Sequence, residues 1–195
     1  QWLNENGGIE ADLTITRIED ESFLVVTTPA TRFRDFHFLK AAIGEAQAYL
    51  TDITSGLATL GIMGPRSREL MEKVTSADLS NEAFPFATSQ EIELGYAQVR
   101  AVRITYVGEL GWEIYIPTEF ALHVFDEIMR AGEAVDLRLC GFHAMGSCRL
   151  EKGYRHWGHD IGPEDSPLEA GLGFAVALGK EADFVGRSAL EAQKA

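Results

Sequence analysis

Apolar and polar residues alternate in several short segments of the chain, which predicts β-strands. Residues 11–18 and 23–27 both alternate, and the acidic turn at residues 19–21 separates them. We therefore expect a β-hairpin over residues 11–27, with Leu13 and Ile15 on its apolar, core-facing side. The same pattern predicts further strands at residues 48–54, 57–63, 90–94, 98–107, 112–116 and 174–178.

Other segments carry apolar residues at helical spacing. They predict helices at residues 29–43, 66–74, 118–131 and 142–152, and after Gly186. Hairpins mixed with separate helices indicate an α+β fold with antiparallel sheets, because a parallel sheet needs regular strand–helix alternation. We interpret residues 1–195 as one domain with possible sub-lobes at about 1–50 and 51–195.

Composition and charge narrow the functional classes. The 195 residues are 46% hydrophobic, enough for a sizeable core. The net charge of −13 disfavours nucleic acid and anionic membranes as partners, since both attract positive patches. No apolar run approaches the roughly 20 residues that span a bilayer.

The two cysteines indicate the redox state of the compartment, and the first residues of the chain bear on its completeness. Cys140 and Cys148 lie eight positions apart on or beside one predicted helix, about 12 Å along its axis, which is beyond disulfide reach. We expect a reducing compartment, namely the cytoplasm, or the mitochondrial matrix in a eukaryote. The chain starts at Gln1 inside a strand-and-turn pattern, so we expect a piece of a longer protein.

Candidate site residues concentrate between residues 106 and 162. Tyr106 and Glu113 lie on a predicted hairpin, with Glu113 inside an apolar strand. A carboxylate there either faces solvent or is partly buried and paired. A paired carboxylate that accepts two N–H groups suits the edge of an amino-pyrimidine ring.

Arg149 shares one face of the predicted helix 142–152 with Phe142 and Met145. An arginine on an apolar face requires a carboxylate, a carbonyl or an anionic ligand. The alternative is an internal ion pair, with Glu113, Glu151 or Glu169 as the candidate partner.

Asp12 and the loop at residues 156–160 each allow two interpretations. Asp12 follows a Gly-Gly turn, where an aspartate either satisfies nearby amides or approaches a ligand closely. His156, His159 and Asp160 have donor types that bind zinc, but no standard spacing completes a site, so we favour hydrogen-bonded loop anchors and no metal.

Five motifs carry a resemblance that extends over nearly the whole chain. They are GGIEADLTITR at residues 7–17, GLATLGIMGPRS at 56–67, YVGELGWEIYIP at 106–117, RLEKGYRHWGHDI at 149–161 and SPLEAGLGF at 166–174. In order and spacing they resemble the folate-binding aminomethyltransferase family of the glycine-cleavage T protein. The similarity is greatest to the folate domain of sarcosine and dimethylglycine dehydrogenases.

The resemblance implies a tetrahydrofolate site in a three-lobed α+β fold, here without the C-terminal barrel lobe. It assigns the catalytic carboxylate near the reactive folate nitrogens to Asp12. It assigns folate binding to Tyr106, Glu113, Arg149 and Tyr154. The implied function is capture of the carbon of an N-methyl amine as 5,10-methylene-tetrahydrofolate.

The resemblance also implies a partner. Oxidation of the amine would belong to a fused or associated flavin dehydrogenase domain, with FAD held in an N-terminal part absent here. Gly146 departs from the family pattern, where an aspartate is expected. Two alternatives remain open: a non-catalytic folate-binding or regulatory module, and a stand-alone tetrahydrofolate-dependent demethylase.

Overall fold

The computed structural model describes all 195 residues and divides them into two compact units. The first unit combines Gln1–Leu50 with Arg155–Ala195, and the second is Thr51–Tyr154. Residues 155–195 therefore belong to the same unit as the N-terminal segment, although they are far from it in the sequence.

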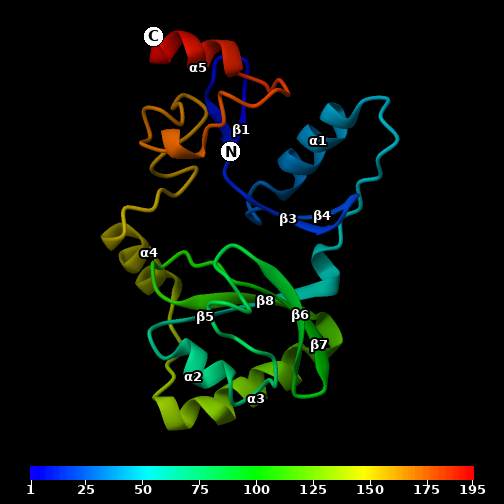
Figure 1. Ribbon diagram of the computed structural model, residues 1–195, viewed down its shortest axis with the longest axis vertical. Helices are drawn as coiled ribbons and strands as arrows, with labels where there is room; N and C mark the ends of the chain where they lie inside the picture. Colours follow the sequence, from blue (N-terminus) through cyan, green and yellow to red (C-terminus); the bar gives the residue numbers. More distant parts are fainter. The chain divides into compact units, whose positions relative to one another are not determined.

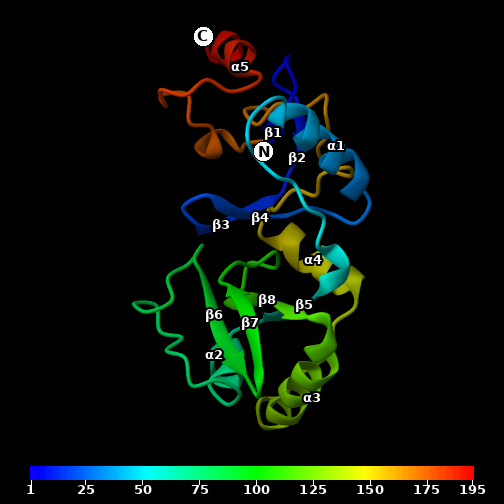
Figure 2. The same ribbon diagram turned by 90° about the vertical axis from the view of Figure 1, so that its right-hand side faces the viewer.

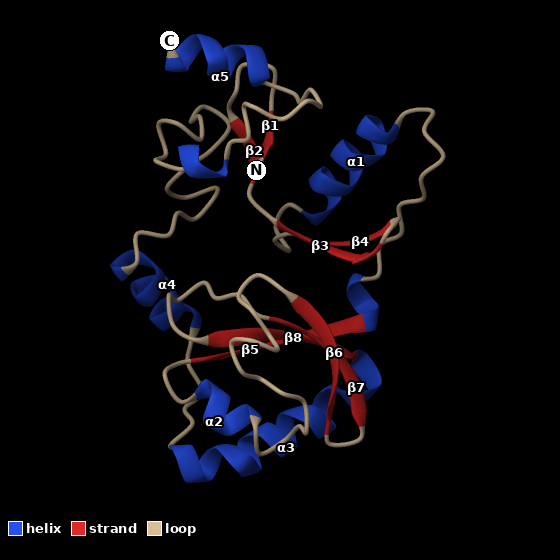
Figure 3. Ribbon diagram, viewed as in Figure 1, coloured by secondary structure: helices blue, strands red, loops and turns tan.

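The second unit is built on a four-stranded antiparallel sheet with the strand order β5-β8-β7-β6 (Figure 1, Figure 3). Its strands are β5 (Leu57–Met63), β6 (Ser89–Leu94), β7 (Ala97–Val102) and β8 (Gly111–Pro117). Its α-helices are α2 (Ser67–Met71), α3 (Ala121–Gly132) and α4 (Phe142–Glu151). Short 3-10 turns lie at Thr54–Gly56, Thr118–Phe120 and Glu133–Val135.

Helices α2 and α3 lie on one face of this sheet, as two perpendicular views show (Figure 1, Figure 2). Alternate residues of β8 enter the core on that side: Trp112, Ile114 and Ile116 are fully buried. Val124 and Ile128 are the buried residues of the apolar stripe of α3, in agreement with the predicted helix.

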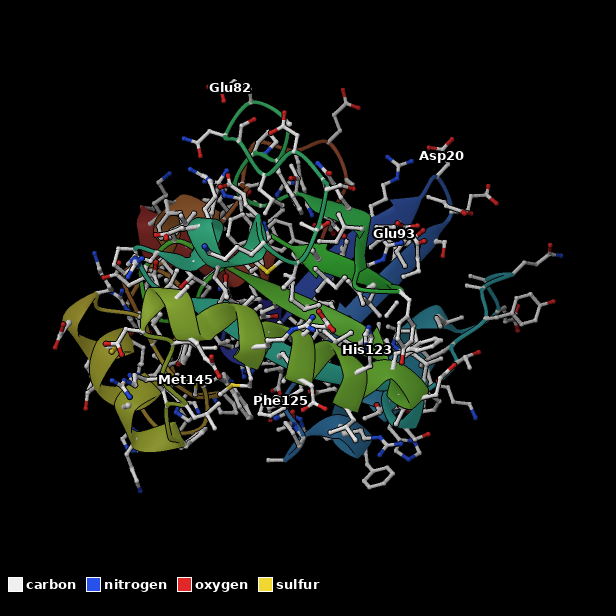
Figure 4. The ribbon with its side chains drawn as sticks, turned by 90° about the horizontal axis from the view of Figure 1, so that it is seen from below. Asp20, Glu82, Glu93, His123, Phe125 and Met145 are labelled. Atoms are coloured by element: carbon white, nitrogen blue, oxygen red, sulfur yellow. The ribbon has the colours of Figure 1, made fainter.

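Side-chain contacts at the helix ends complete this unit. His123 of α3, labelled in Figure 4, stacks on Tyr96 at the β6–β7 turn, with ring centroids 3.5 Å apart. Its Nε2 accepts the Tyr96 backbone N–H at 3.2 Å. The N-terminal part of α3 is therefore tied to the turn at the end of the sheet.

The first unit contains two two-stranded antiparallel sheets and two helices. Its strands are β1 (Trp2–Leu3), β2 (Ile9–Ala11), β3 (Thr14–Glu19) and β4 (Ser22–Val26). Its helices are α1 (Arg32–Ile43) and α5 (Arg187–Lys194), with a 3-10 turn at Gly173–Ala175. A small buried core consists of Leu3, Ile9, Ile161 and Leu190.

Most expected elements are present, but two predicted strands are wrong. Residues 48–53 are irregular, with Thr54 opening a 3-10 turn, and residues 174–178 form the end of a 3-10 turn followed by irregular chain. Tyr49 is 99% exposed and Phe174 is 87% exposed. Neither segment has a partner strand, and an apolar run without a partner leaves its backbone groups to solvent.

The hairpin at residues 11–27 is confirmed as the pair β3–β4, but two details differ. The regular strand starts at Thr14, so Asp12 lies between strands rather than inside one. The expected core-facing side was wrong, because Ile15 is 51% exposed while Leu24 on the opposite face, across from Thr16, is buried. No helix in the structure is long and apolar enough to cross a membrane.

A buried carboxylate connects the start of α1 to the chain before it. Asp35 is only 3% exposed and accepts hydrogen bonds from the Thr27 and Thr31 hydroxyls. The Arg34 guanidinium lies beside it, with Nη2 2.8 Å from Oδ1. Burial acts to raise the pKa of Asp35, but the two hydroxyls and Arg34 outweigh it and hold the pKa below the usual 3.8.

This network predicts a pH-dependent contribution to stability. A lowered folded-state pKa stabilises the fold above the unfolded value of 3.8, and this contribution is lost as pH falls through the folded value. Asp35→Asn should therefore lower the free energy of unfolding by about 2 kcal/mol at pH 7. In denaturant titrations the gap between the variant and the parent should begin to narrow below about pH 4 and close only below the folded-state pKa of Asp35. A gap that persists unchanged at low pH would contradict the account.

Candidate functional site

The second face of the four-stranded sheet carries the candidate site in the second unit. Because Trp112, Ile114 and Ile116 point into the core, the alternation of β8 places Glu113 and Tyr115 on the opposite face. The register sets Gly61 of β5 and Val102 of β7 directly across from Glu113.

Gly61 leaves space beside the Glu113 carboxylate. A Cβ built at Gly61 meets only the Met63 methyl group, at 3.5 Å, which is an ordinary contact. One strand neighbour of Glu113 therefore has no side chain, and the Met63 methyl group is the nearest atom to the open position beside the carboxylate. Gly111 is glycine for another reason, since a Cβ there lies 2.5 Å from the Ile62 carbonyl oxygen.

The Glu113 carboxylate has a fixed donor on its own strand. The Tyr115 hydroxyl donates to Glu113 Oε2 at 2.5 Å. Tyr115 is 4% exposed, and burial, followed by the hydrogen bond and the charge of Glu113, raises its pKa above the ordinary tyrosine value. Tyr115 therefore remains protonated and donates.

The loop between β7 and β8 contacts the end of α4. Gly108 has φ +71°, which favours glycine, and its Cα hydrogen points at the aliphatic stem of Lys152. A Cβ at this position would collide with that stem. The glycine of the YVGELG motif thus allows α4 to approach the loop that carries Tyr106.

Helix α4 ends in a Schellman motif. The Tyr154 N–H bonds to the Arg149 carbonyl at 2.9 Å, and the Gly153 N–H bonds to the Leu150 carbonyl at 2.9 Å. Gly153 has the required positive φ of +69°. The motif turns the chain back over the helix end and fixes where Tyr154 lies.

Arg149 and two tyrosines meet at this helix end. Arg149 is 5% exposed, and its Nη1 donates to the Tyr154 carbonyl at 3.0 Å. The Tyr154 ring stacks on Tyr106, with ring centroids 6.2 Å apart and planes at 24°. A buried cation and two near-parallel aromatic rings suit a flat, polar ligand.

The Schellman glycine provides a test of this arrangement. Nothing lies within 4 Å of a Cβ at Gly153 or Gly146, but only Gly153 has positive φ. Gly153→Ala should cost about 1 kcal/mol of unfolding free energy through backbone strain. The matched control Gly146→Ala, inside α4, should gain about 0.5–1 kcal/mol. Thermal unfolding of both variants tests this, and equal effects would contradict the assigned helix end.

Asp12 lies in the first unit, directly after β2. Its Oδ1 accepts a hydrogen bond from the Gln1 side chain at 3.1 Å, and it is half-buried. The chain just before it is anchored, because Trp157 Nε1 donates to the Ile9 carbonyl at 2.6 Å and Arg34 Nη2 donates to the Glu10 carbonyl. The Arg34 guanidinium also stacks over the Trp157 ring, 4.2 Å from its centroid.

The Gly-Gly turn before Asp12 has a structural reason. Gly7 adopts φ +82°, and a Cβ at Gly8 would overlap the Pro163 carbonyl. The Asn4 side chain closes the turn by accepting the backbone N–H groups of Asn6 and Gly8 at 3.0 and 2.9 Å. The glycines of this motif thus bring β2 against the chain at Pro163.

The loop at residues 156–160 is held by internal hydrogen bonds. Asp160 Oδ2 accepts the His156 backbone N–H at 2.9 Å, and Asp160 Oδ1 lies 2.9 Å from His159 Nδ1. The structure contains no group of three or more His, Cys, Asp or Glu side chains arranged to hold a metal ion. Cys140 and Cys148 are free thiols.

The contacts gather some predicted site residues and add two that the sequence did not indicate. Tyr154 contacts both Tyr106 and Arg149 in the second unit, and Glu113 lies on the sheet of the same unit. Gly61 and Tyr115 were missed. Tyr115 could have been predicted from the strand pattern, because residues two apart in a strand share a face with each other and hence with Glu113. The position of Gly61 beside Glu113 could not, because it depends on the β5–β8 register.

An antiparallel sheet with helices on one face and a carboxylate on the other defines an α+β architecture. The chain belongs to the aminomethyltransferase T-protein family, since the model of the GCVT N-terminal domain matches residues 1–180. This confirms the resemblance found in the sequence motifs.

Individual relatives agree with the family. The chain is 42% identical to 4-methylaminobutanoate oxidase (formaldehyde-forming) of Paenarthrobacter nicotinovorans, over 97% of this chain and 23% of the relative. It is 39% identical to mitochondrial sarcosine dehydrogenase of Mus musculus, over 99% and 23% respectively. It thus spans about a quarter of the length of these relatives.

A solved structure confirms the α+β fold. The aminomethyltransferase T of the glycine cleavage system from Bartonella henselae superposes with a TM-score of 0.84 at 26% identity. The match covers 98% of this chain and 51% of that chain. The molecule is therefore an aminomethyltransferase-like domain that is related to sarcosine and dimethylglycine dehydrogenases.

Proposed function

We propose that this domain binds tetrahydrofolate and transfers to it the methyl-derived carbon of an N-methyl amine. The observation that carries the proposal is the Glu113 carboxylate beside the bare backbone of Gly61. The pterin ring presents an amino group and a ring N–H on one edge, and an ionised carboxylate accepts both. Family membership supports the same ligand.

The aromatic pair and the buried arginine extend this proposal. Tyr106 and Tyr154 supply flat surfaces on which an aromatic part of the folate stacks. Arg149, buried at the helix end, supplies positive charge for a carbonyl or carboxylate of the ligand. Tyr106, Glu113, Arg149 and Tyr154 are thus the proposed folate-binding residues.

Asp12 is the proposed catalytic carboxylate. The carbon arrives as an iminium, R₂N⁺=CH₂, and becomes bonded to both folate nitrogens, while the released amine leaves as R₂NH₂⁺ with the two protons of those nitrogens. A carboxylate stabilises the cationic species along this path and relays the protons. Its anchored backbone, tied through Ile9 and Glu10, holds Asp12 in place.

The iminium requires an oxidised amine. Relatives of this chain are named as dehydrogenases and an oxidase, and the chain covers about a quarter of them. We infer a fused or associated flavin dehydrogenase domain as partner, in which bound FAD would accept the hydride of the N-methyl group. None of the residues described above takes part in that oxidation.

Kinetics of two charge-removing variants separate the proposed roles. Glu113→Gln keeps the shape but removes the charge that binds the ligand edge, and should raise the KM for tetrahydrofolate about 10- to 100-fold. Asp12→Asn should lower kcat for 5,10-methylene-tetrahydrofolate formation about 100-fold or more with a small change in KM. The assay uses the full-length protein with its amine substrate. Unchanged product yield in Asp12→Asn would reject the catalytic assignment.

A steric variant tests the open space beside Glu113. Gly61→Val places a branched side chain across from the carboxylate, where a Cβ meets no atom closer than 3.5 Å, so the fold should be retained. Tetrahydrofolate binding in calorimetry should fall at least tenfold, because the added methyl groups occupy the approach of the ring. The matched control Leu57→Val, on the same strand and face but across from Pro117, should bind nearly as the parent does. Full affinity in Gly61→Val would place the ligand elsewhere.

A non-catalytic regulatory module is the second candidate. One relative, 34% identical over 98% of this chain, is the mitochondrial pyruvate dehydrogenase phosphatase regulatory subunit of Mus musculus. Such a module would bind tetrahydrofolate through Glu113 yet show no change in product when Asp12 is replaced. The kinetic comparison above distinguishes the two candidates.

A further inference from the structure

Glu113 requires a restraint that its strand neighbours do not supply. The terminal torsion of a glutamate side chain is broad, so its carboxylate plane rotates unless a contact fixes it. Gly61 on one side has no side chain, and Val102 on the other side has no polar group. The hydroxyl of Tyr115, 2.5 Å from Oε2, is the hydrogen bond that can hold the plane.

Tyr115 is itself held in place. It is 4% exposed, and the sheet register sets Thr59 and Arg100 across from it on the same face. Arg100 is anchored in turn by bonds to Ser89 and Glu91, at 3.2 and 2.5 Å. Tyr115 therefore holds its hydroxyl on a rigid part of the sheet.

We propose that Tyr115 is a positioning residue that orients the Glu113 carboxylate and thereby sets the selectivity of the site for a ring edge with two adjacent N–H donors. This inference rests on the proposed function and deepens it. The hydroxyl occupies one direction at Oε2 and leaves Oε1 and the remaining lone pair of Oε2 to the ligand. A carboxylate fixed in one plane accepts two parallel N–H groups better than one that rotates, because less freedom is lost on binding.

The proposal predicts a specific loss in Tyr115→Phe, which keeps the ring and removes only the donor. Calorimetry on the full chain measures the affinity for tetrahydrofolate and for its 2-deamino analogue, which lacks one of the two donors. The variant should bind tetrahydrofolate about 5- to 20-fold more weakly, while its affinity for the analogue should change less than twofold. The ratio of the two affinities does not depend on the fraction of folded protein, so a partly unfolded sample still gives the answer.

A double-mutant cycle tests whether Tyr115 acts through Glu113. In the Glu113→Ala background, which leaves no acceptor for the Tyr115 hydroxyl, Tyr115→Phe should change the affinity for tetrahydrofolate less than twofold. The matched control Tyr96→Phe removes a hydroxyl from the exposed tyrosine at the β6–β7 turn and should leave both affinities unchanged.

The outcomes separate this inference from the proposed function. Equal losses for both ligands in Tyr115→Phe, or an undiminished loss in the Glu113→Ala background, would show a merely structural tyrosine and overturn the inference alone. The inference alone would also be overturned if Tyr115→Phe left tetrahydrofolate binding intact while Glu113→Gln weakened it. An absence of tetrahydrofolate binding in the unmodified full-length protein would overturn the proposed function together with this inference.

Discussion

The burial of one face of the β5-β8-β7-β6 sheet is the constraint on which the candidate site depends. Trp112, Ile114 and Ile116 enter the core beneath α2 and α3, and each fully buried large side chain contributes about 1.5–3 kcal/mol. Because side chains alternate along a strand, this burial commits Glu113 and Tyr115 to the opposite face. A register slip of one residue would bury the carboxylate and expose the core residues.

The same sheet shows how the protein accommodates a carboxylate inside an apolar strand. A buried charge without a partner is costly, and Glu113 has a partner in the protonated Tyr115 hydroxyl. The helix end is built in a comparable way, since Arg149 is buried but donates to the Tyr154 carbonyl. In both cases a neighbour within five positions of the chain forms a hydrogen bond with the charged group.

Features that depend on residues close together in the sequence could be predicted, and features that depend on contacts between distant segments could not. The α+β class, the β3–β4 hairpin, α1, α3 and α4 follow from local periodicity and turn residues, and Gly153 as a helix end follows from its residue type. The failed strands at residues 48–54 and 174–178 needed a partner that local patterns do not reveal. The open space at Gly61 depends on the pairing of two strands that are far apart in sequence, and the pairing of residues 155–195 with the N-terminal unit is equally non-local.

A crystal structure of the protein with bound tetrahydrofolate tests the central claim most directly. The account predicts that the amino group and ring N–H of the pterin lie within hydrogen-bond distance of the Glu113 carboxylate, with the ring over Gly61. A tetrahydrofolate bound elsewhere, with Glu113 facing only solvent, would contradict it.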